Sequence, residues 1–326
     1  MKSRILTALG RADGFVSGQE LCDGLKVSRT AVWKVINQLK DEGYEIESVT
    51  GKGYRITARP DVVTSDEVES RLRTQWAGHP VHFFETIDST NNAARKLAED
   101  GAPGGTLAVA EEQRSGKGRR GRGWVMEPGS AIAMSLIVRP QIQPSRASMM
   151  TLVMGMAVTA ACRSYCGVQA GIKWPNDVVV DGKKICGILT EMSSEIDFIN
   201  YLVIGAGINT HVEHFPEELS DRALSLHTVM GRKPDRAGLI AACMEKFEQY
   251  YGLFLKTQDM SLLREEYESF LVGTGDRVRV LEPGNEYEGV SCGIDDRGEL
   301  LVRRADGTVE HVYAGEVSVR GIYGYV

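Results

Sequence analysis

The longest apolar stretch of this sequence runs from Met149 to Cys162 and contains no charged residue. It is too short to cross a bilayer, which takes about 20 apolar residues in a helix. The pattern therefore predicts a helix that is buried by the rest of the fold. At 326 residues the chain is long enough for such a core and for two or three domains.

Charged residues are unevenly distributed along the chain. The net charge of −6 excludes a protein that coats nucleic acid or membrane along its whole surface. Residues 1–60, however, hold ten Lys and Arg against seven Asp and Glu, so 10 − 7 leaves +3 there and −9 for the remainder. A positively charged N-terminal segment followed by a negatively charged remainder indicates two different partners.

Cysteine usage and the N-terminus predict a soluble, cytoplasmic protein. The six cysteines form no C-x-x-C pair, which argues against a zinc site or a disulfide framework and fits a reducing compartment. The first residues do not resemble a signal peptide, because Gly10, Arg11 and Asp13 interrupt their short apolar run. We expect no membrane partner.

The first sixty residues predict two short helices followed by a hairpin. Ser17 and Glu20 have the spacing of a capping box, and Ser28 can cap a second helix. An extended segment follows, and residues 51–53 turn the chain back on itself. Residues 57–61 are the expected linker to the next domain.

This order of elements, with its positive charge, predicts a winged helix-turn-helix that binds DNA. Side chains on the polar face of the second helix would enter the major groove, and a lysine of the hairpin would contact the phosphate backbone. The candidate DNA-binding residues are Arg29, Thr30, Trp33, Lys34, Asn37 and Lys52. A small helical protein-interaction module is the alternative, since capped helices with cationic faces are common.

From His82 onward, strand patterns alternate with helix patterns. Residues 88–91 could cap a helix that runs to about Asp100, and Asp181-Gly182 suits a type I′ hairpin turn. After Leu271, short strands and tight turns predict a small SH3-like β-barrel. The expected domains are 1–60, 61–271 and 272–326, and the expected strands of the middle domain lie within 82–84, 107–110, 131–138, 178–189 and 201–209.

The stretch from Ser115 to Trp124 concentrates positive charge among glycines. Its cations offer donors suited to phosphate and carboxylate oxygens, and its glycines make the free segment entropically expensive to order. We expect a mobile loop that an anionic ligand orders. The residues alone leave a solvated basic turn or a nucleic-acid patch open. The four cations are Lys117, Arg119, Arg120 and Arg122.

Further motifs follow this stretch. Residues 173–177 put a cation, a rigid turn, an amide and a carboxylate in succession, and Lys184 lies on the strand after the hairpin turn. Gly205-Ala206-Gly207 is not a dinucleotide fingerprint, because the third glycine and a following helix are missing. A Walker A motif is also absent. We interpret His211 and His214 as residues of a mobile surface loop, not as metal ligands.

Together these motifs resemble biotin protein ligases, in the family's order and over essentially the whole chain. With the N-terminal winged helix, the sequence is similar to the bifunctional class that also represses the biotin operon. The resemblance implies an α+β multidomain chain whose central mixed sheet has the class II synthetase-like biotin/lipoate ligase fold. The motifs that carry it are Asp88–Asn91, Gln113, Gly116–Trp124, Lys173–Asp177, Lys184 with Gly187, and Gly205–Asn209.

The resemblance implies that biotin reacts with ATP and Mg²⁺ to form biotinyl-5′-AMP, with no metal held by the protein itself. Arg119 and Lys184 would be catalytic, and Lys117 stands where the family commonly has arginine. The implied biotin-binding residues are Ser89, Thr90, Asn91, Gln113, Gly116, Lys117, Arg119, Lys184, Gly187, Gly205 and Gly207. The implied ATP- and adenylate-binding residues are Arg119, Arg120, Arg122, Trp124, Asn176, Asp177, Lys184, Asn209 and Arg320, with Glu316 nearby in sequence.

The implied partners are a biotin carboxyl carrier domain of a carboxylase, operator DNA, and a second copy of the chain when the adenylate binds. Three alternatives stay open at this point. The chain could be a ligase with a non-repressing N-terminal domain, a DNA-binding biotin sensor without ligase activity, or a lipoate ligase. The basic stretch with Lys184 argues against a pure sensor, and the ordered motif set argues against lipoate.

Overall fold

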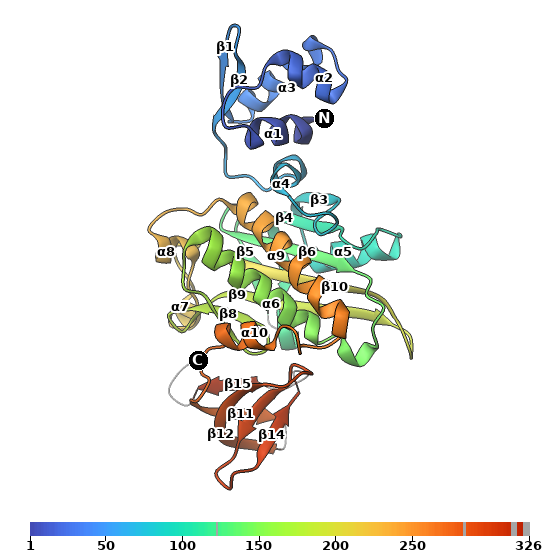
Figure 1. Cartoon of the computed structure of the whole chain (residues 1–326). Coiled ribbons are helices and arrows are strands. Elements are labelled where there is room, and N and C mark those ends of the chain that lie inside the picture. Colours follow the sequence, from blue (N-terminus) through green and yellow to red (C-terminus); the bar gives the residue numbers. More distant parts are fainter. Residues whose placement is uncertain (122, 283–284, 314–317, 322–326) are drawn as a thin grey trace.

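The computed structural model describes residues 1–121, 123–282, 285–313 and 318–321. Figure 1 shows three parts in a row: helices with a hairpin at the N-terminal end, a large sheet with helices in the middle, and a small sheet at the C-terminal end. This arrangement is the predicted α+β multidomain architecture.

The N-terminal part is the predicted winged helix. Ser17 accepts a hydrogen bond from Glu20 N while the Glu20 carboxylate accepts one from Ser17 N, so the capping box is confirmed. The linker prediction is wrong at its start, because residues 57 and 58 still belong to the second strand of the hairpin. The elements are α1 (Lys2–Arg11), α2 (Gly18–Leu25), α3 (Arg29–Asp41), β1 (Glu45–Val49) and β2 (Gly53–Ala58).

The central sheet has the strand order β3-β4-β6-β10-β9-β8-β7, with β5 paired to β4. β3 and β4 run parallel and the other neighbours run antiparallel, so the predicted mixed sheet is confirmed. The strands are β3 (Val81–Ile87), β4 (Leu107–Lys117), β5 (Gly123–Met126), β6 (Ala131–Val138), β7 (Gly171–Lys173), β8 (Asp177–Val180), β9 (Lys183–Ser194) and β10 (Ile199–Asn209).

Helices cover both faces of this sheet, but unequally. α6 and α9 lie across one face in Figure 1, while α5 packs against β4, β6 and β10 on the other. The helices are α4 (Ser65–Arg71), α5 (Thr90–Glu99), α6 (Met149–Ala161), α7 (Glu217–Ser220), α8 (Leu226–Met230), α9 (Arg236–Thr257) and α10 (Arg264–Phe270).

The two faces of the sheet differ in side-chain size. Large aliphatic residues such as Met134 and Ile204 point into the main core beneath α6 and α9. Alternate residues along a strand point to opposite faces, so the intervening positions form the other face. That face, called the small-residue face below, leaves room for other groups above the backbone. Its central positions are Ala108, Ala110, Ala133, Ser135, Gly205 and Gly207.

The buried helix predicted from the apolar stretch is confirmed as α6. With its flanking turns, the segment Pro144–Cys166 is long and apolar enough to cross a membrane, but 78% of its most apolar window is buried inside the fold. Such burial is typical of a core helix. The chain thus uses this stretch to fill the space between the sheet and α9.

The C-terminal part is a five-stranded antiparallel sheet in the order β14-β13-β12-β11-β15, in agreement with the predicted small β domain. The turn at Gly298 joins it to the central domain, because Trp174 Nε1 donates to Gly298 O at 3.0 Å. A Cβ at Gly298 would lie 2.4 Å from Leu152 of α6, so only glycine fits there. The strands are β11 (Arg277–Glu282), β12 (Asn285–Ile294), β13 (Leu300–Arg303), β14 (Val309–Val312) and β15 (Ser318–Gly321).

Candidate active site

The basic stretch Ser115–Trp124 forms a hairpin that extends from the central sheet. β4 ends at Lys117, a 3₁₀ turn spans Arg119–Gly121, and β5 returns the chain. Backbone pairing thus makes strands at both ends of the stretch, where a loop was expected. Arg122 and the side chain of Arg120 lie outside the described part. Ordering by a ligand stays a prediction.

Two glycines of the small-residue face are covered by predicted site residues. A Cβ at Gly205 would lie 2.1 Å from Asn91 Oδ1, and a Cβ at Gly207 would lie 3.0 Å from the Trp124 indole. These contacts give a physical reason for glycine at both positions. The space expected to admit a ligand is therefore shared with side chains of the chain itself.

A row of alternating cationic, neutral and anionic groups joins the basic hairpin to β8 and β9. Arg119 Nη1 donates to Asn176 Oδ1 at 2.7 Å, and Asn176 Nδ2 donates to Asp177 Oδ1 at 3.2 Å. The same carboxylate oxygen lies 2.6 Å from Lys184 Nζ. A Cβ at Gly187 would lie 2.7 Å from Nζ, so a larger residue there would displace the lysine from this position. The structure thus brings together residues of three separate motifs, which we call the cation row.

The start of α5 lies beside the amide of Gln113. Thr90 N donates to Gln113 Oε1 at 2.6 Å, and Thr90 Oγ1 lies 2.9 Å from the same oxygen. Ser89 is the N-cap residue, but its side chain forms no capping bond. The interpretation of residues 88–91 as side-chain caps is therefore wrong, because a β4 side chain satisfies the helix N–H instead.

Two residues that sequence reasoning missed complete this cluster. Ser135 Oγ, fully buried on β6, lies 2.8 Å from Thr90 Oγ1 and 2.6 Å from Asn91 Oδ1. Asn91 Nδ2 donates to Glu191 Oε2 at 2.7 Å and to Leu189 O at 3.4 Å. The only sequence signal was a serine within an otherwise apolar strand. Below, "hydroxyl chain" means Gln113, Thr90, Ser135, Asn91 and Glu191.

Lys117 ties the basic hairpin to the start of α5. Its Nζ donates to Asn92 Oδ1 at 3.2 Å, and Asn92 Nδ2 donates in turn to the Asp88 carboxylate. The hydrogen bond from Asn92 lowers the pKa of Asp88, with a smaller contribution from the charge of Lys117. This contact positions the hairpin next to the hydroxyl chain.

The remaining predicted ligand residues have other surroundings. Asn209 Nδ2 lies 3.5 Å from Lys184 O, where it supports the backbone of the cation row. Arg320 lies on β15, paired with Arg279 of β11 in the C-terminal sheet. Its side chain and Glu316 lie outside the described part, so their predicted roles stay untested.

The candidate DNA-binding residues gather on the outer side of the winged helix. Trp33 is 57% exposed, which is unusual for a tryptophan without a partner surface. At the hairpin, Arg55 lies 4.8 Å above the Phe15 ring, with Lys52 Nζ at 5.9 Å. Exposed residues of this set are Arg29, Thr30, Trp33, Lys34 and Lys52, and Asn37 is half-buried.

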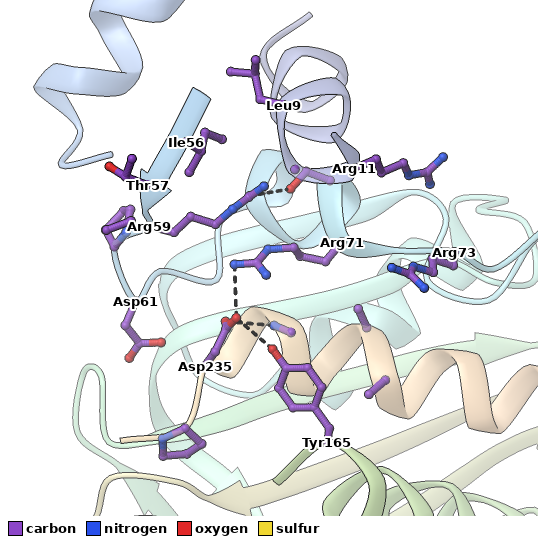
Figure 2. Close-up of a pocket in the computed structure, with 18 of the residues that line it drawn as sticks. Leu9, Arg11, Ile56, Thr57, Arg59, Asp61, Arg71, Arg73, Tyr165 and Asp235 are labelled. Atoms are coloured by element: carbon purple, nitrogen blue, oxygen red, sulfur yellow. Dashed lines mark hydrogen bonds and ion pairs between the residues drawn. The ribbon is translucent and has the colours of Figure 1, made fainter. Parts of the chain in front are cut away.

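A cavity of about 790 Å³ separates the winged helix from the central domain (Figure 2). On its wall, Arg71 Nη2 lies 3.1 Å from Asp235 Oδ2, and the Tyr165 hydroxyl donates to the same oxygen at 2.9 Å. The cavity is far in sequence from the predicted ligand motifs. Three of its polar groups, Arg71, Tyr165 and Asp235, are paired with one another.

Behind this cavity, α4 packs against α1 around a fully buried carboxylate. Glu67 accepts hydrogen bonds from the Tyr44 hydroxyl at 2.9 Å, from Arg59 Nη1 at 2.8 Å and from Arg71 Nε at 2.7 Å. Burial, reinforced by Glu67, raises the pKa of Tyr44 far above its ordinary value. Tyr44, Arg59, Glu67, Arg71 and Asp235 together form what we call the junction cluster.

A second buried ion pair holds the linker. Arg236, 1% exposed, contacts Asp61 Oδ2 and Glu111 Oε1, both at 3.0 Å. His211 is also buried, and its ring nitrogens lie 2.8 Å from Gly129 O and 3.0 Å from Pro234 O. The surface-loop interpretation of His211 is therefore wrong. Backbone carbonyls and the linker carboxylate hold this histidine inside the fold.

One group of metal-type ligands lies in the C-terminal sheet. Atoms of Asp295, Glu299 and His311 lie within 4.8 Å of one another. Asp295 Oδ1 also accepts from Arg297 N and Glu299 N, as expected for a turn carboxylate. Turn geometry therefore explains the group, and the expectation that the protein holds no metal of its own stays a prediction.

Comparisons with known families divide the chain into the same three parts. Residues 2–55 match the "HTH domain", residues 83–209 match the "Biotin/lipoate A/B protein ligase family", and residues 274–320 match the "Biotin protein ligase C terminal domain". The hydroxyl chain and the cation row both lie within the middle match.

Curated proteins resemble the chain over nearly its full length. "Bifunctional ligase/repressor BirA" of Bacillus spizizenii is 39% identical over 94% of each chain, and the protein of that name from Escherichia coli is 29% identical over 97% of this chain and 96% of its own. Among solved structures, a biotin protein ligase from Aquifex aeolicus with biotin and ATP has a TM-score of 0.65 and 27% identity, covering 74% of this chain and 98% of that one.

Proposed function

The chain belongs to the biotin protein ligase family, and we propose that it uses MgATP to attach biotin to a lysine of a biotin carboxyl carrier domain. The cation row is the observation that carries this proposal. In the first step a carboxylate oxygen of biotin attacks the α-phosphorus of ATP, and the bond to pyrophosphate breaks. Both reactants are anions, so fixed cations in a partly buried site lower the barrier.

Within the row, Lys184 is suited to bridge the biotin carboxylate and the α-phosphate. Asp177 holds the lysine in place before a substrate arrives, since their 2.6 Å contact fixes the ammonium group. Arg119, anchored by Asn176, is suited to retain the adenylate. Mg²⁺ arrives with ATP, and the oxygens of Asn176 and Asp177 are the ligand type that it prefers.

In the second step, the acceptor lysine attacks the acyl carbon of biotinyl-5′-AMP, and AMP leaves. The mixed anhydride is already activated, so no protein nucleophile is required. We assign biotin binding to Ser89, Thr90, Asn91, Gln113, Gly116 and Lys117 in and around the hydroxyl chain, and adenylate binding to Trp124 beside the arginines of the hairpin. We propose docking of the acceptor near Arg320 and Glu316.

The winged helix supports a second activity, repression by binding operator DNA. The exposed Trp33 and its cationic neighbours motivate it. We further propose that the adenylate orders the basic hairpin and that this ordering promotes a homodimer. The homodimer would then bind operator DNA within the cytoplasm. In this scheme residues 1–60 form the DNA-binding domain, residues 61–271 form the catalytic domain, and residues 272–326 form the C-terminal domain. A mobility-shift titration in which the adenylate leaves operator affinity unchanged would contradict this activity.

The ligase activity is tested by incubating the protein with biotin, MgATP and a carboxyl carrier domain, while following pyrophosphate and the mass of the acceptor. Lys184→Ala should lose about 100-fold or more of the activation rate, as for removal of a charge-stabilising donor. Arg119→Gly should form the adenylate but release it. Lys183→Ala, the matched control at the neighbouring lysine, whose ammonium group donates to Ser220 O and not to Asp177, should stay active. A fully active Lys184→Ala protein would contradict the assignment.

The same assay separates the other candidates. Pyrophosphate release with lipoate in place of biotin would indicate a lipoate ligase. Operator binding without pyrophosphate release would indicate a DNA-binding sensor. The second result would also leave the cation row without a function, which is why we place the ligase first.

A further inference from the structure

Trp174 belongs to the Lys173–Asp177 motif but has no part in the reaction proposed above. Its side chain is buried, with 4% of the residue exposed, so little of the indole is accessible to a ligand. Its Nε1 donates to Gly298 O at 3.0 Å, across the boundary between the central domain and the C-terminal sheet (Figure 1). An indole N–H can only donate, and a buried donor without a partner is destabilising, so this bond fixes the position of the ring.

The turn that contains Gly298 is inserted into the central domain. Gly298 is buried, whereas its neighbours Asp296 and Arg297 are exposed. Its φ of +75° favours glycine, and an added Cβ would clash with Leu152 of α6. Met260 N, in the segment between α9 and α10, donates to Asp296 O at 2.8 Å. The Gly298 carbonyl therefore has a fixed position against the central domain.

The turn between β7 and β8, which contains Trp174, is also held from a second side. Asn176 O accepts from Ile188 N at 2.9 Å, and Asn176 Nδ2 donates to Ile188 O at 3.2 Å, so β9 holds this end of the turn. Only Pro175 separates Trp174 from Asn176, and a proline has a fixed φ. A displacement of the indole is therefore passed on to Asn176.

We propose that Trp174 is a positioning residue, which the Gly298 turn holds so that Asn176 keeps its place on the ATP side of the cation row. The proposal rests on the ligase function and adds a contact between domains that serves one of its two substrates. Asn176 anchors Arg119 at 2.7 Å and donates to Asp177, so its position sets those of the groups assigned to the adenylate and Mg²⁺. The hydroxyl chain shares no residue with this contact, so biotin binding should not depend on it.

The first measurement compares Trp174→Phe with the wild-type protein by pyrophosphate release from biotin and MgATP. Phenylalanine keeps an aromatic ring but removes the N–H, so the KM for ATP should rise about five- to tenfold, as for one lost hydrogen bond, with the KM for biotin unchanged. Trp76→Phe is the matched control. Trp76 packs against Phe247 and Tyr251 of α9, and its Nε1 donates to none of the residues that the structure describes. That variant should keep both KM values.

A second measurement disturbs the contact from the C-terminal sheet. The methyl group of Gly298→Ala meets Leu152, so the turn should withdraw from the central domain and the KM for ATP should again rise. Gly307→Ala is the control, because Gly307 has a φ of +89° in an exposed turn of the same sheet, with nothing beyond its chain neighbours within 4 Å of the added methyl. Both variants carry the strain of a positive φ, but only the first meets the central domain. Gly307→Ala should therefore leave the KM for ATP unchanged.

The double variant Trp174→Phe/Gly298→Ala distinguishes one shared contact from two independent losses. Substitutions that break the same contact should give a KM for ATP close to that of the worse single variant, whereas independent effects multiply. Multiplication, an unchanged KM for ATP in Trp174→Phe, or an equal rise in both KM values would overturn the proposal. Should Gly298→Ala not fold, Trp174→Phe measured against Trp76→Phe decides. A wild-type protein inactive with biotin and MgATP would overturn the ligase function itself.

Discussion

The hydroxyl chain and the junction cluster are both buried and polar, but they are built differently. The hydroxyl chain consists of neutral hydroxyls and amides and ends at a single carboxylate. The junction cluster places the Glu67 carboxylate within hydrogen-bond distance of two guanidinium groups and a tyrosine hydroxyl, and it pairs one of these guanidinium groups, Arg71, with a second carboxylate, Asp235. The first cluster consists mainly of neutral groups, whereas the second consists mainly of charged groups that satisfy one another.

This difference in charge separates a cluster suited to ligand binding from a cluster that stabilises the fold. Neutral groups can exchange partners with a ligand at small free-energy cost, because each hydrogen bond is worth about 1 kcal/mol net. Buried charges cannot, since an unpaired one is strongly destabilising. We therefore expect substitutions in the hydroxyl chain to change affinity for biotin, and substitutions in the junction cluster to change the stability of the fold.

The largest effect is expected from Glu67→Ala. The change leaves two arginines facing each other without their carboxylate, and should lower the free energy of unfolding by about 3–5 kcal/mol. Urea denaturation measures it. Glu47→Ala is the control, because Glu47 pairs with Arg55 at the surface, where such pairs contribute only about 0–1 kcal/mol. Equal losses in the two variants would remove the distinction between the clusters.

Arg236→Met extends the same reasoning to the linker. The variant keeps side-chain bulk but removes the donors to Asp61 and Glu111, and should lower the free energy of unfolding by about 2 kcal/mol. Thermal unfolding followed by circular dichroism measures the change. Arg232→Met, at an exposed position just before α9, should melt like the wild type. A stable Arg236→Met protein would mean that the linker is held by other contacts.

Thr90→Val, in the hydroxyl chain, should have a small effect on stability and a larger effect on the affinity for biotin. Valine keeps the shape and the backbone N–H to Gln113 but removes the hydroxyl, so the free energy of unfolding should fall by only about 1 kcal/mol. The KM for biotin should rise several-fold while the KM for ATP stays unchanged. Thr86→Val, at the end of β3, is the control. Loss of stability without a change in biotin KM would assign Thr90 to the fold alone.

The smallest expected effect is a pH dependence at the junction. Burial, together with Asp235, raises the pKa of Tyr165 to about 12 from an ordinary value of 10.0. Its contribution to stability is therefore complete below pH 10 and is lost as the pH rises toward 12. Melting temperatures measured from pH 8 to 11.5 should fall less steeply for Tyr165→Phe than for the wild type. Parallel curves would exclude ionisation of Tyr165 as a cause.

Features that depend on neighbouring residues could be predicted from the sequence. The capping box at Ser17, the Asp181-Gly182 turn and the buried α6 are set by local chemistry, and each is confirmed. The cation row also joins the motifs that were expected to form a site. Its residues belong to short motifs that follow one another along the chain in the order of the family, and this order made them recognisable. Their roles in ligand binding stay predictions.

Features that depend on distant pairs could not be predicted. Arg236 and Asp61 are 175 positions apart, and Asn91 and Glu191 are 100 apart. Nothing in the local pattern marks either pair, because a buried arginine and an exposed one look the same in sequence. Helix α1 was missed for a different, local reason, since Met1 offers no side-chain cap.

The most direct test of the difference between the two clusters is the melting temperature with and without saturating biotin, measured for the wild type, Glu67→Gln and Ser135→Ala. A ligand that binds only the folded state raises that temperature, and at a fixed ligand concentration the increase grows with the logarithm of its affinity. Glu67→Gln should melt lower but keep the full biotin-induced increase, and Ser135→Ala should melt near the wild type with a reduced increase. A reduced increase in Glu67→Gln, or a full one in Ser135→Ala, would contradict the separation of binding from support.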